Sequence, residues 1–317
     1  MTRRGAALFI LMSVVWGLPY MLIKVAVHHL SPAMVVEGRT AIGAAILLPL
    51  AIRQGQIRPV LRAWRPLLVY TVAELAIPWY LLSDAEKHLP SSLSGLLIAA
   101  VPLIGVVLAA ATGHRDRIPR RGLLGLVIGL IGVGALLGLD VGSSGLGSVG
   151  EVGIVAVGYA IGPLVVSGHL DQVSSVALAA VSLLLVATVY LPVAVWQHPT
   201  RVPPGTVVAA VVALGVLCTA LAFVAFFELI KEIGSTRATI ITYLNPAVAV
   251  VLGVAVLGEQ FTLGTGVGFV LILAGSWLST IPRGKVVATP DTFAGQHPGA
   301  VASGDLHNPL SGPSIWS

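Results

Sequence analysis

The sequence predicts an all-α membrane protein with ten transmembrane helices in two inverted five-helix repeats. Three observations lead to this fold class: an apolar composition, ten apolar runs long enough to cross a bilayer, and a similarity between the two halves of the chain. Together they indicate a chain that is solvated mainly by lipid rather than by water.

Composition excludes a water-soluble enzyme. Hydrophobic residues make up 56% of the 317 residues and charged residues only 10%, whereas about a quarter of a typical soluble domain is charged. The single cysteine, Cys218, excludes a disulfide framework and a thiolate metal cage. The net charge of +5 does not predict a nucleic-acid partner, because in a membrane protein the placement of the basic residues matters more.

Ten apolar runs approach the length of about 20 residues that a helix needs to cross the hydrocarbon core. They are continuously apolar rather than alternating, which favours helices over the strands of a membrane barrel. The first run is too long for a signal peptide, so we expect it to be retained as a helix. In chain order the runs cover residues 5–27, 33–52, 66–83, 91–112, 122–139, 149–167, 173–195, 206–229, 238–257 and 262–281.

The basic residues predict the orientation of these spans. With the N-terminus in the cytoplasm, 14 Lys and Arg fall on the cytoplasmic side, and only Lys87 and Arg201 fall on the outer side. We therefore expect a multi-pass protein of the plasma (inner) membrane with both termini in the cytoplasm. Lys24 and Trp79, near the outer ends of their spans, read as interfacial anchors. The composition after residue 281 predicts a disordered cytoplasmic tail over 282–317.

The two halves of the chain resemble each other at a shift of 143 to 144 residues. The ordered matches pair Pro49 with Pro192, Lys87 with Lys231, and Trp16 with Tyr159. We expect one five-helix repeat over 5–140 and a second over 148–281. Because five is odd, the second repeat enters the membrane from the opposite side, and inverted repeats place a site at mid-membrane between them.

The second half also resembles the EamA-like drug/metabolite transporters, over residues 222–278. The matching residues are Glu228, Leu229, Gly234, Ala238, Tyr243, Asn245, Pro246, Gly253, Gly258, Glu259 and Gly275. The first half is similar through Trp16, Gly17 and Arg39. The resemblance covers residues 5–281 and implies ten helices that move small organic solutes, often outward and often coupled to protons. It does not imply a particular substrate.

Glu74 is the strongest candidate for substrate binding or coupling, since it lies near the centre of the third span. An unpaired carboxylate there costs on the order of several kcal/mol, so we expect Glu74 to face a cavity or to be protonated. Such a group suits a proton carrier or an anchor for an amine. The alternative is a structural carboxyl that is hydrogen-bonded to a neighbouring helix.

Arg39 is a second charged candidate. It lies two residues after Glu37, so the two side chains cannot face the same partner. Both are expected within about 10 Å of the outer surface. Arg39 either snorkels to the lipid headgroups or lines an outer vestibule.

Four aromatic residues, Trp16, Tyr20, Tyr159 and Tyr243, lie deeper than an interfacial belt explains. We expect the repeat-related pair, Trp16 and Tyr159, to project toward the axis between the halves. There, aromatic rings could hold apolar or cationic solutes by stacking and cation-π contact. Helix packing is the alternative for all four.

Asn245 and Pro246 stand together in the ninth span. A proline at mid-helix frees a backbone carbonyl, and broken helices of transporters present such groups to a cavity. Asn245 is therefore a further binding candidate, with a simple packing kink at Pro246 as the alternative.

Glycines recur in the fifth and tenth spans, with four-residue spacings such as Gly125–Gly129 and Gly264–Gly268. These small-xxx-small patterns are typical of close helix packing. They predict a contact within the chain or the face of a homodimer.

The sequence favours a secondary transporter that works by alternating access, with a small-molecule substrate, the lipid bilayer as its surroundings and protons as possible coupling ions. No metal-ligand spacing or phosphate loop is present, so we expect no cofactor. Two alternative classes remain. One is a polytopic membrane enzyme, which would need catalytic groups gathered in one site, and the other is a channel or receptor.

Overall fold

The computed structural model describes residues 2–111, 120–140, 145–234 and 241–280. Within these residues the chain is helical, and no β-strand occurs. The all-α fold class predicted from the sequence is therefore confirmed. The predicted tail, 282–317, lies outside the described residues.

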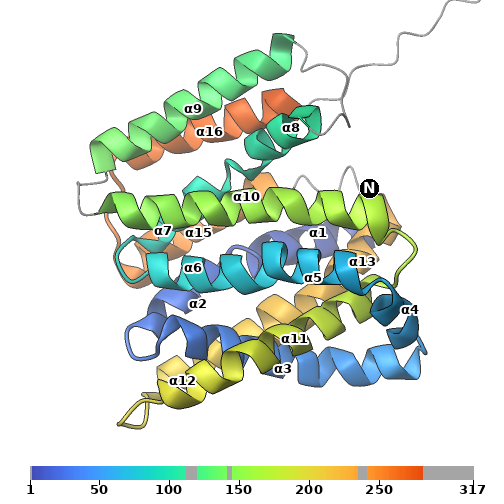
Figure 1. The fold of residues 1–317 in the computed structure, drawn as a ribbon. Coiled ribbons are helices and arrows are strands. Elements are labelled where there is room, and N and C mark those ends of the chain that lie inside the picture. Colours follow the sequence, from blue (N-terminus) through green and yellow to red (C-terminus); the bar gives the residue numbers. More distant parts are fainter. Residues whose placement is uncertain (1, 112–119, 141–144, 235–240, 281–317) are drawn as a thin grey trace, which may run out of the picture. The chain divides into compact units, whose positions relative to one another are not determined.

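The helices follow the order of the predicted spans (Figure 1). In the first half they are α1 (Arg3–Val15), α2 (Leu18–Val27), α3 (Pro32–Arg53), α4 (Ile57–Arg62), α5 (Trp64–Tyr70), the π-helical segment η1 (Thr71–Ala76), α6 (Ile77–Ala85), α7 (Ser91–Ile98), α8 (Val101–Ala111) and α9 (Arg120–Asp140). In the second half they are α10 (Leu146–His169), α11 (Ser175–Trp196), α12 (Gly205–Gly215), the π-helical segment η3 (Val216–Leu221), α13 (Ala222–Ile233), α15 (Ile241–Leu257) and α16 (Leu263–Thr280).

Eight helical stretches in the described residues are long and apolar enough to cross a membrane, and two shorter apolar helices complete the expected set. Several spans are composed of consecutive helices. The first combines α1 and α2, which are separated at Trp16 and Gly17, and the third combines α5, η1 and α6. The fourth is interrupted between α7 and α8, because Pro102 has no backbone N–H to bond the carbonyl of Ile98 and its ring clashes with that carbonyl. In contrast, α15 runs through Pro246 without interruption, so the predicted break is absent there.

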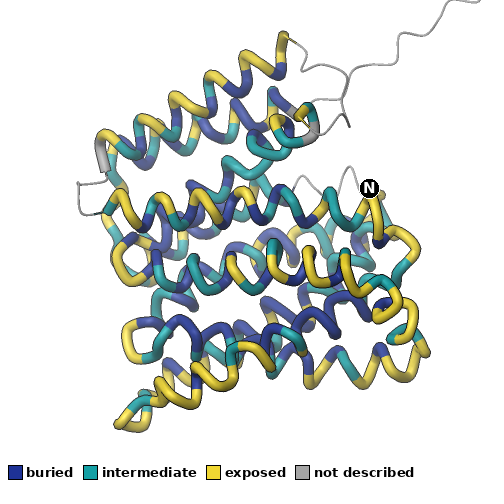
Figure 2. Tube along the Cα trace, viewed as in Figure 1, coloured by how far each residue is buried: buried dark blue, intermediate teal, exposed yellow. Residues whose placement is uncertain are grey.

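Large apolar side chains cover the outside of the helices as well as their interior. Figure 2 shows exposed residues along the outward side of many helices, and in α9 these include Leu123, Leu124, Leu130 and Ile131. In water such a surface would aggregate, whereas in a bilayer it faces lipid tails of the same polarity. The exposed surface thus agrees with the membrane location inferred from the composition.

Helices pair across the two halves in a symmetric pattern. The second span packs against the seventh (α3 with α11), the fourth against the ninth (α7 with α15) and the fifth against the tenth (α9 with α16). The third span packs against the sixth (α6 with α10), and correspondingly the eighth packs against the first (α12 with α2). Exchange of the halves leaves this set of pairs unchanged, as a two-fold relation between the repeats requires.

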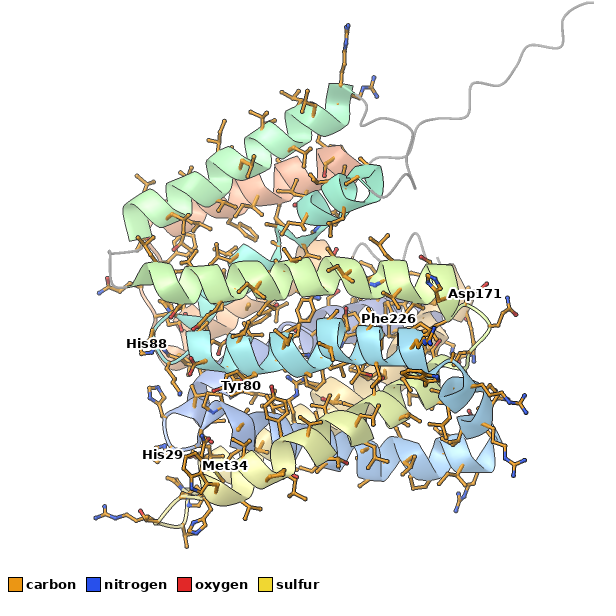
Figure 3. The ribbon with its side chains drawn as sticks, in the orientation of Figure 1. His29, Met34, Tyr80, His88, Asp171 and Phe226 are labelled. Atoms are coloured by element: carbon orange, nitrogen blue, oxygen red, sulfur yellow. The ribbon has the colours of Figure 1, made fainter. Side chains whose placement is uncertain are left out.

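Equivalent turns of the two repeats lie at opposite ends of the helices. Figure 3 shows His29, in the turn before α3, and His88, in the turn before α7, at one end. Asp171, in the turn before α11, lies at the other end. Since α3 and α11 are the second helices of their repeats, the repeats are inverted. The end that carries His29 and His88 is called the α6–α7 end below.

Glycines of α9 and α16 let these two helices approach closely. A side chain on Gly275 would overlap the backbone of Gly125 and Gly129, and one on Gly132 would meet the backbone of Ile272. These glycines therefore form a contact within the chain, one of the two arrangements expected from their spacing. Gly134, by contrast, has open space around its Cα.

We predict that Gly275→Ala destabilises the protein by about 1–3 kcal/mol, because the added methyl group must push the α9 backbone away. The matched control is Gly134→Ala, which adds the same group where nothing obstructs it and favours the helix by up to about 1 kcal/mol. Thermal unfolding in detergent measures both. Equal melting temperatures for the two variants would contradict the close packing of α9 against α16.

Candidate functional site

Arg39 is buried at the contact between the two halves. Its side chain is only 4% exposed. One guanidinium nitrogen donates to Thr219 Oγ1 in η3 at 3.2 Å, and the guanidinium carbon lies 3.6 Å from the centre of the Trp79 ring in α6. Its Nε is buried without a hydrogen-bond partner among the described residues. Arg39 therefore points into the protein, and the expectation that it snorkels to the headgroups is wrong.

Trp79 and Thr219 were not among the binding candidates inferred from the sequence. Trp79 was assigned to the outer aromatic belt, but it is only 8% exposed and lies against Arg39. A cation over an indole face is stabilised by the ring quadrupole, more strongly where water is excluded. Sequence depth alone does not reveal which way a side chain faces around its helix, so this contact had no signal in the sequence.

Both halves carry a π-helical segment in the third helix of the repeat, η1 in the first and η3 in the second. A π turn widens the helix and displaces backbone carbonyls from their regular partners, and such turns are frequent at functional sites. In η3, Thr219 Oγ1 donates to the carbonyl of Leu214 at 2.8 Å. In η1, the hydroxyl of Tyr190 donates to the carbonyl of Ala76 at 3.0 Å. Side chains thus compensate for the irregular backbone.

Glu74 lies within η1 and faces α10 of the other half. Its Oε2 atom is buried and has no hydrogen-bond partner among the described residues. Two glycines of α10 make room for this segment, because a side chain on Gly158 would overlap the carbonyl of Ala73 and one on Gly162 would overlap Glu74 Oε2. The Oε2 atom is therefore directed into the protein although the residue as a whole is half-buried, and among the described residues no hydrogen-bond partner holds this atom.

Tyr159 and Tyr20 lie next to these charged groups. Tyr159, in α10, packs against two hydrophobic clusters, one that contains Tyr20 and one that contains Trp79. It is within electrostatic range of both Glu74 and Arg39. Tyr20, in α2, is 7% exposed and lies within electrostatic range of Tyr159. Arg39, Glu74, Trp79, Tyr159 and Thr219 are called the central polar group below.

Three of the candidates predicted from the sequence lie outside the central polar group and make contacts between helices. Trp16 packs against Phe226 of α13, with ring centroids 4.6 Å apart, in a cluster separate from those of Tyr159. The Tyr243 hydroxyl donates to the carbonyl of Ser276 in α16 at 3.2 Å. With its amide nitrogen turned toward α1, Asn245 donates to the carbonyl of Ser13 at 3.1 Å. Trp16 and Tyr159 therefore do not share one site.

Two cavities of the described residues lie away from the central polar group. A groove of about 380 Å³ follows the contact of α3 with α11 and is lined by Glu37 among several small residues. A second cavity of about 480 Å³ lies beside the turn between α3 and α4. Neither Arg39 nor Glu74 lines either of them. The polar groups expected at a mid-membrane site are present, and neither of these two cavities reaches Arg39 or Glu74.

Comparison with known proteins finds transporters over most of the chain. The EamA-like transporter family matches residues 3–138 and, a second time, residues 152–281. The protein described as uncharacterized inner membrane transporter YedA of Escherichia coli (strain K12) is 27% identical over 289 residues, covering 87% of this chain and 92% of that protein. The protein described as uncharacterized transporter YvbV of Bacillus subtilis (strain 168) is 23% identical, covering 85% and 89% respectively.

A solved crystal structure is similar in fold. The TM-score is 0.63 at 20% sequence identity, and the alignment covers 88% of this chain and 97% of that one. At this identity the likeness concerns the fold alone.

We predict that Thr219→Val lowers the free energy of unfolding by about 1–3 kcal/mol, because it removes an acceptor from the buried, charged Arg39. Thr188→Val is the matched control, since Thr188 is exposed and bonds only to the carbonyl of Leu184 in its own helix. Thermal unfolding of both variants is compared in detergent. If Thr219→Val is no more destabilising than Thr188→Val, the bond to Arg39 does not support the fold.

Proposed function

We propose, since this chain belongs to the EamA-like transporter family, that it is a secondary transporter that carries a small metabolite or drug-like solute by alternating access. The central polar group is the proposed site of binding and coupling. The observation that carries this proposal is the buried guanidinium of Arg39, which contacts Trp79 from one half and Thr219 from the other. Inverted repeats bind their substrates where the two halves meet.

Two unsatisfied atoms support a binding role for the central polar group. Arg39 Nε and Glu74 Oε2 are buried without partners among the described residues. A buried polar group without a partner costs about 1–3 kcal/mol, and a solute could remove this cost when the site opens. A solute with an acceptor for Arg39 and a donor for Glu74 fits the two groups, and the rings of Trp79 and Tyr159 offer apolar faces beside them.

The place of Glu74 supports proton coupling as part of this proposal. An ionised carboxylate without a partner in an apolar interior costs on the order of several kcal/mol, so in the closed protein Glu74 carries a proton. When the site opens to water or receives a cationic group, the ionised form is no longer penalised. Release of the proton and binding of the solute would then be linked, which is the requirement for coupled transport.

The proposed location is the inner membrane, with both termini in the cytoplasm and with export as the direction of transport. Exposed basic residues of the described chain support this orientation. They cluster at the end of the helix bundle that carries the N-terminus of the chain, while Lys87 and Arg201 belong to the opposite end. The clustered residues are Arg3, Arg4, Arg53, Arg58, Arg62, Arg65, Arg120, Arg121 and Lys231. In this orientation the α6–α7 end faces outward.

We predict that Glu74→Gln lowers the rate of transport driven by an imposed pH gradient at least about tenfold, the equivalent of about 1.4 kcal/mol. Proteoliposomes are tested with panels of labelled amines, amino acids and organic dyes. Glu228→Gln is the matched control, since Glu228 lies at the surface and pairs with Arg4 and Lys231. Unchanged coupling in Glu74→Gln would reject the role of Glu74, and the absence of flux above empty vesicles for every solute would count against transport.

A further inference from the structure

A second group of buried polar atoms lies at the α6–α7 end, away from the central polar group. Glu86 follows the last residue of α6, in a segment that the sequence placed in a loop, yet its side chain is 0% exposed. Neither of its carboxyl oxygens has a hydrogen-bond partner among the described residues, and the same is true of the hydroxyls of Ser91 and Ser94 in α7. Buried polar atoms without partners are rare and call for an explanation.

The charged neighbours of Glu86 are already engaged with other groups. Lys24 Nζ, from α2, donates to the carbonyls of Glu86 and Leu89 at 2.7 and 2.9 Å. It stabilises the C-terminal end of α6, as cations do at helix C-termini, so its expected role as a membrane anchor is wrong. On the same helix, Asp84 pairs with Lys87 at 2.8 Å. In the part of the chain that the structure describes, the carboxyl of Glu86 therefore has no hydrogen-bond partner.

Glu259, in the turn between α15 and α16, provides the contrast. Its carboxylate accepts hydrogen bonds from the backbone nitrogens of Ser91 at 2.6 Å and Ser92 at 2.9 Å. These are the first amides of α7, and the N-terminus of a helix favours negative charge. Glu259 is therefore held as an ionised cap, and it places a negative charge close to Glu86.

The two carboxyls have opposite protonation tendencies. Burial raises the pKa of Glu86 well above its usual value, the ammonium of Lys24 opposes this shift, and the charge of Glu259 adds to it. Burial also acts to raise the pKa of Glu259, but the hydrogen bonds from Ser92 and Ser91 outweigh it and lower the pKa overall. Two neighbouring acids with separated pKa values form an arrangement in which one can exchange a proton while the other stays charged.

We propose that Glu86 is a second proton-binding site, at the α6–α7 end, which is protonated while this end is closed and ionised when it opens to water. Opening transfers the proton from the carboxyl to water, giving a carboxylate and a hydronium ion, and closing reverses the transfer. Ser91 and Ser94 lie at the start of α7, after the turn that holds Glu86, and Tyr20 of α2 is within electrostatic range of Glu86. The role of the site in transport rests on the proposed function, whereas proton binding itself does not.

The pH dependence has a defined sign. The pKa of Glu86 is raised in the closed form. Its contribution to the stability of the closed form is therefore fully present below the ordinary carboxyl pKa and is lost as the pH rises through the raised pKa. Glu259 acts oppositely, since the contribution of a lowered pKa is present above the ordinary value and lost as the pH falls through the lowered pKa. The two acids therefore act in separate pH ranges.

The test is chemical modification of the full-length protein in liposomes by dicyclohexylcarbodiimide, an apolar reagent that attacks protonated carboxyl groups. Peptide mass spectrometry quantifies the adduct on each glutamate as a function of pH. We expect an adduct on Glu86 that is large at acidic pH and falls as the pH rises, with Glu259 remaining unmodified over the same range. The proposal is overturned if Glu86 is unmodified at every pH, or if its modification does not depend on pH.

A second measurement separates proton binding from a structural role. The melting temperature of the wild type should fall as the pH rises from the ordinary carboxyl pKa toward the raised pKa of Glu86, and Glu86→Gln should flatten this fall while it keeps the shape of the protonated side chain. Asp84→Asn, in the same helix, should retain the wild-type slope. A Glu86→Gln variant with the wild-type slope would contradict the proposal. Because neither readout needs a substrate, failure of the transport assay leaves this result intact, and the reverse also holds.

Discussion

The burial of one permanent charge determines how the centre of this protein is arranged. A guanidinium cannot lose its proton in a protein, so Arg39 needs groups that replace water inside a bundle surrounded by lipid. The ring of Trp79 and the hydroxyl of Thr219 supply them. Since Trp79 belongs to the first repeat and Thr219 to the second, this environment exists only where the repeats meet. Both residues stand on helices that contain a π-helical segment.

The exchange of helices between repeats also limits how the protein can move. Each repeat packs its helices mainly against those of the other, as α3 does against α11 and α9 against α16, so the halves cannot separate as two rigid bodies. Under the proposed alternating access, opening would instead tilt paired helices relative to other pairs. The segments that suit such movement are η1 and η3, where the regular hydrogen bonding is already interrupted, whereas the glycine contact of α9 with α16 favours a pair that stays together.

Hydropathy and internal similarity predicted the class, the order of the spans and the inversion, because these depend on the length and composition of segments. They also pointed to Glu74, Tyr20 and Tyr159 as polar or aromatic residues deeper than the interface. Other assignments failed where the direction of a side chain mattered. The sequence predicted Trp79 as an interfacial residue, since it gives depth along a helix but not rotation around it, and it did not single out Glu86, which lies between the predicted spans 66–83 and 91–112. The π segments had no recognised pattern in the sequence.

Labelling of equivalent turns in the two repeats tests the inversion on which the account depends. His29→Cys and Gln172→Cys stand 143 residues apart at exposed positions before α3 and α11, in a chain whose single native cysteine, Cys218, is buried. A membrane-impermeant maleimide is applied to intact cells and to lysed cells. With inverted repeats, the cysteine at position 29 reacts in intact cells and the one at position 172 reacts only after lysis. Reaction of both cysteines from the same side would contradict it.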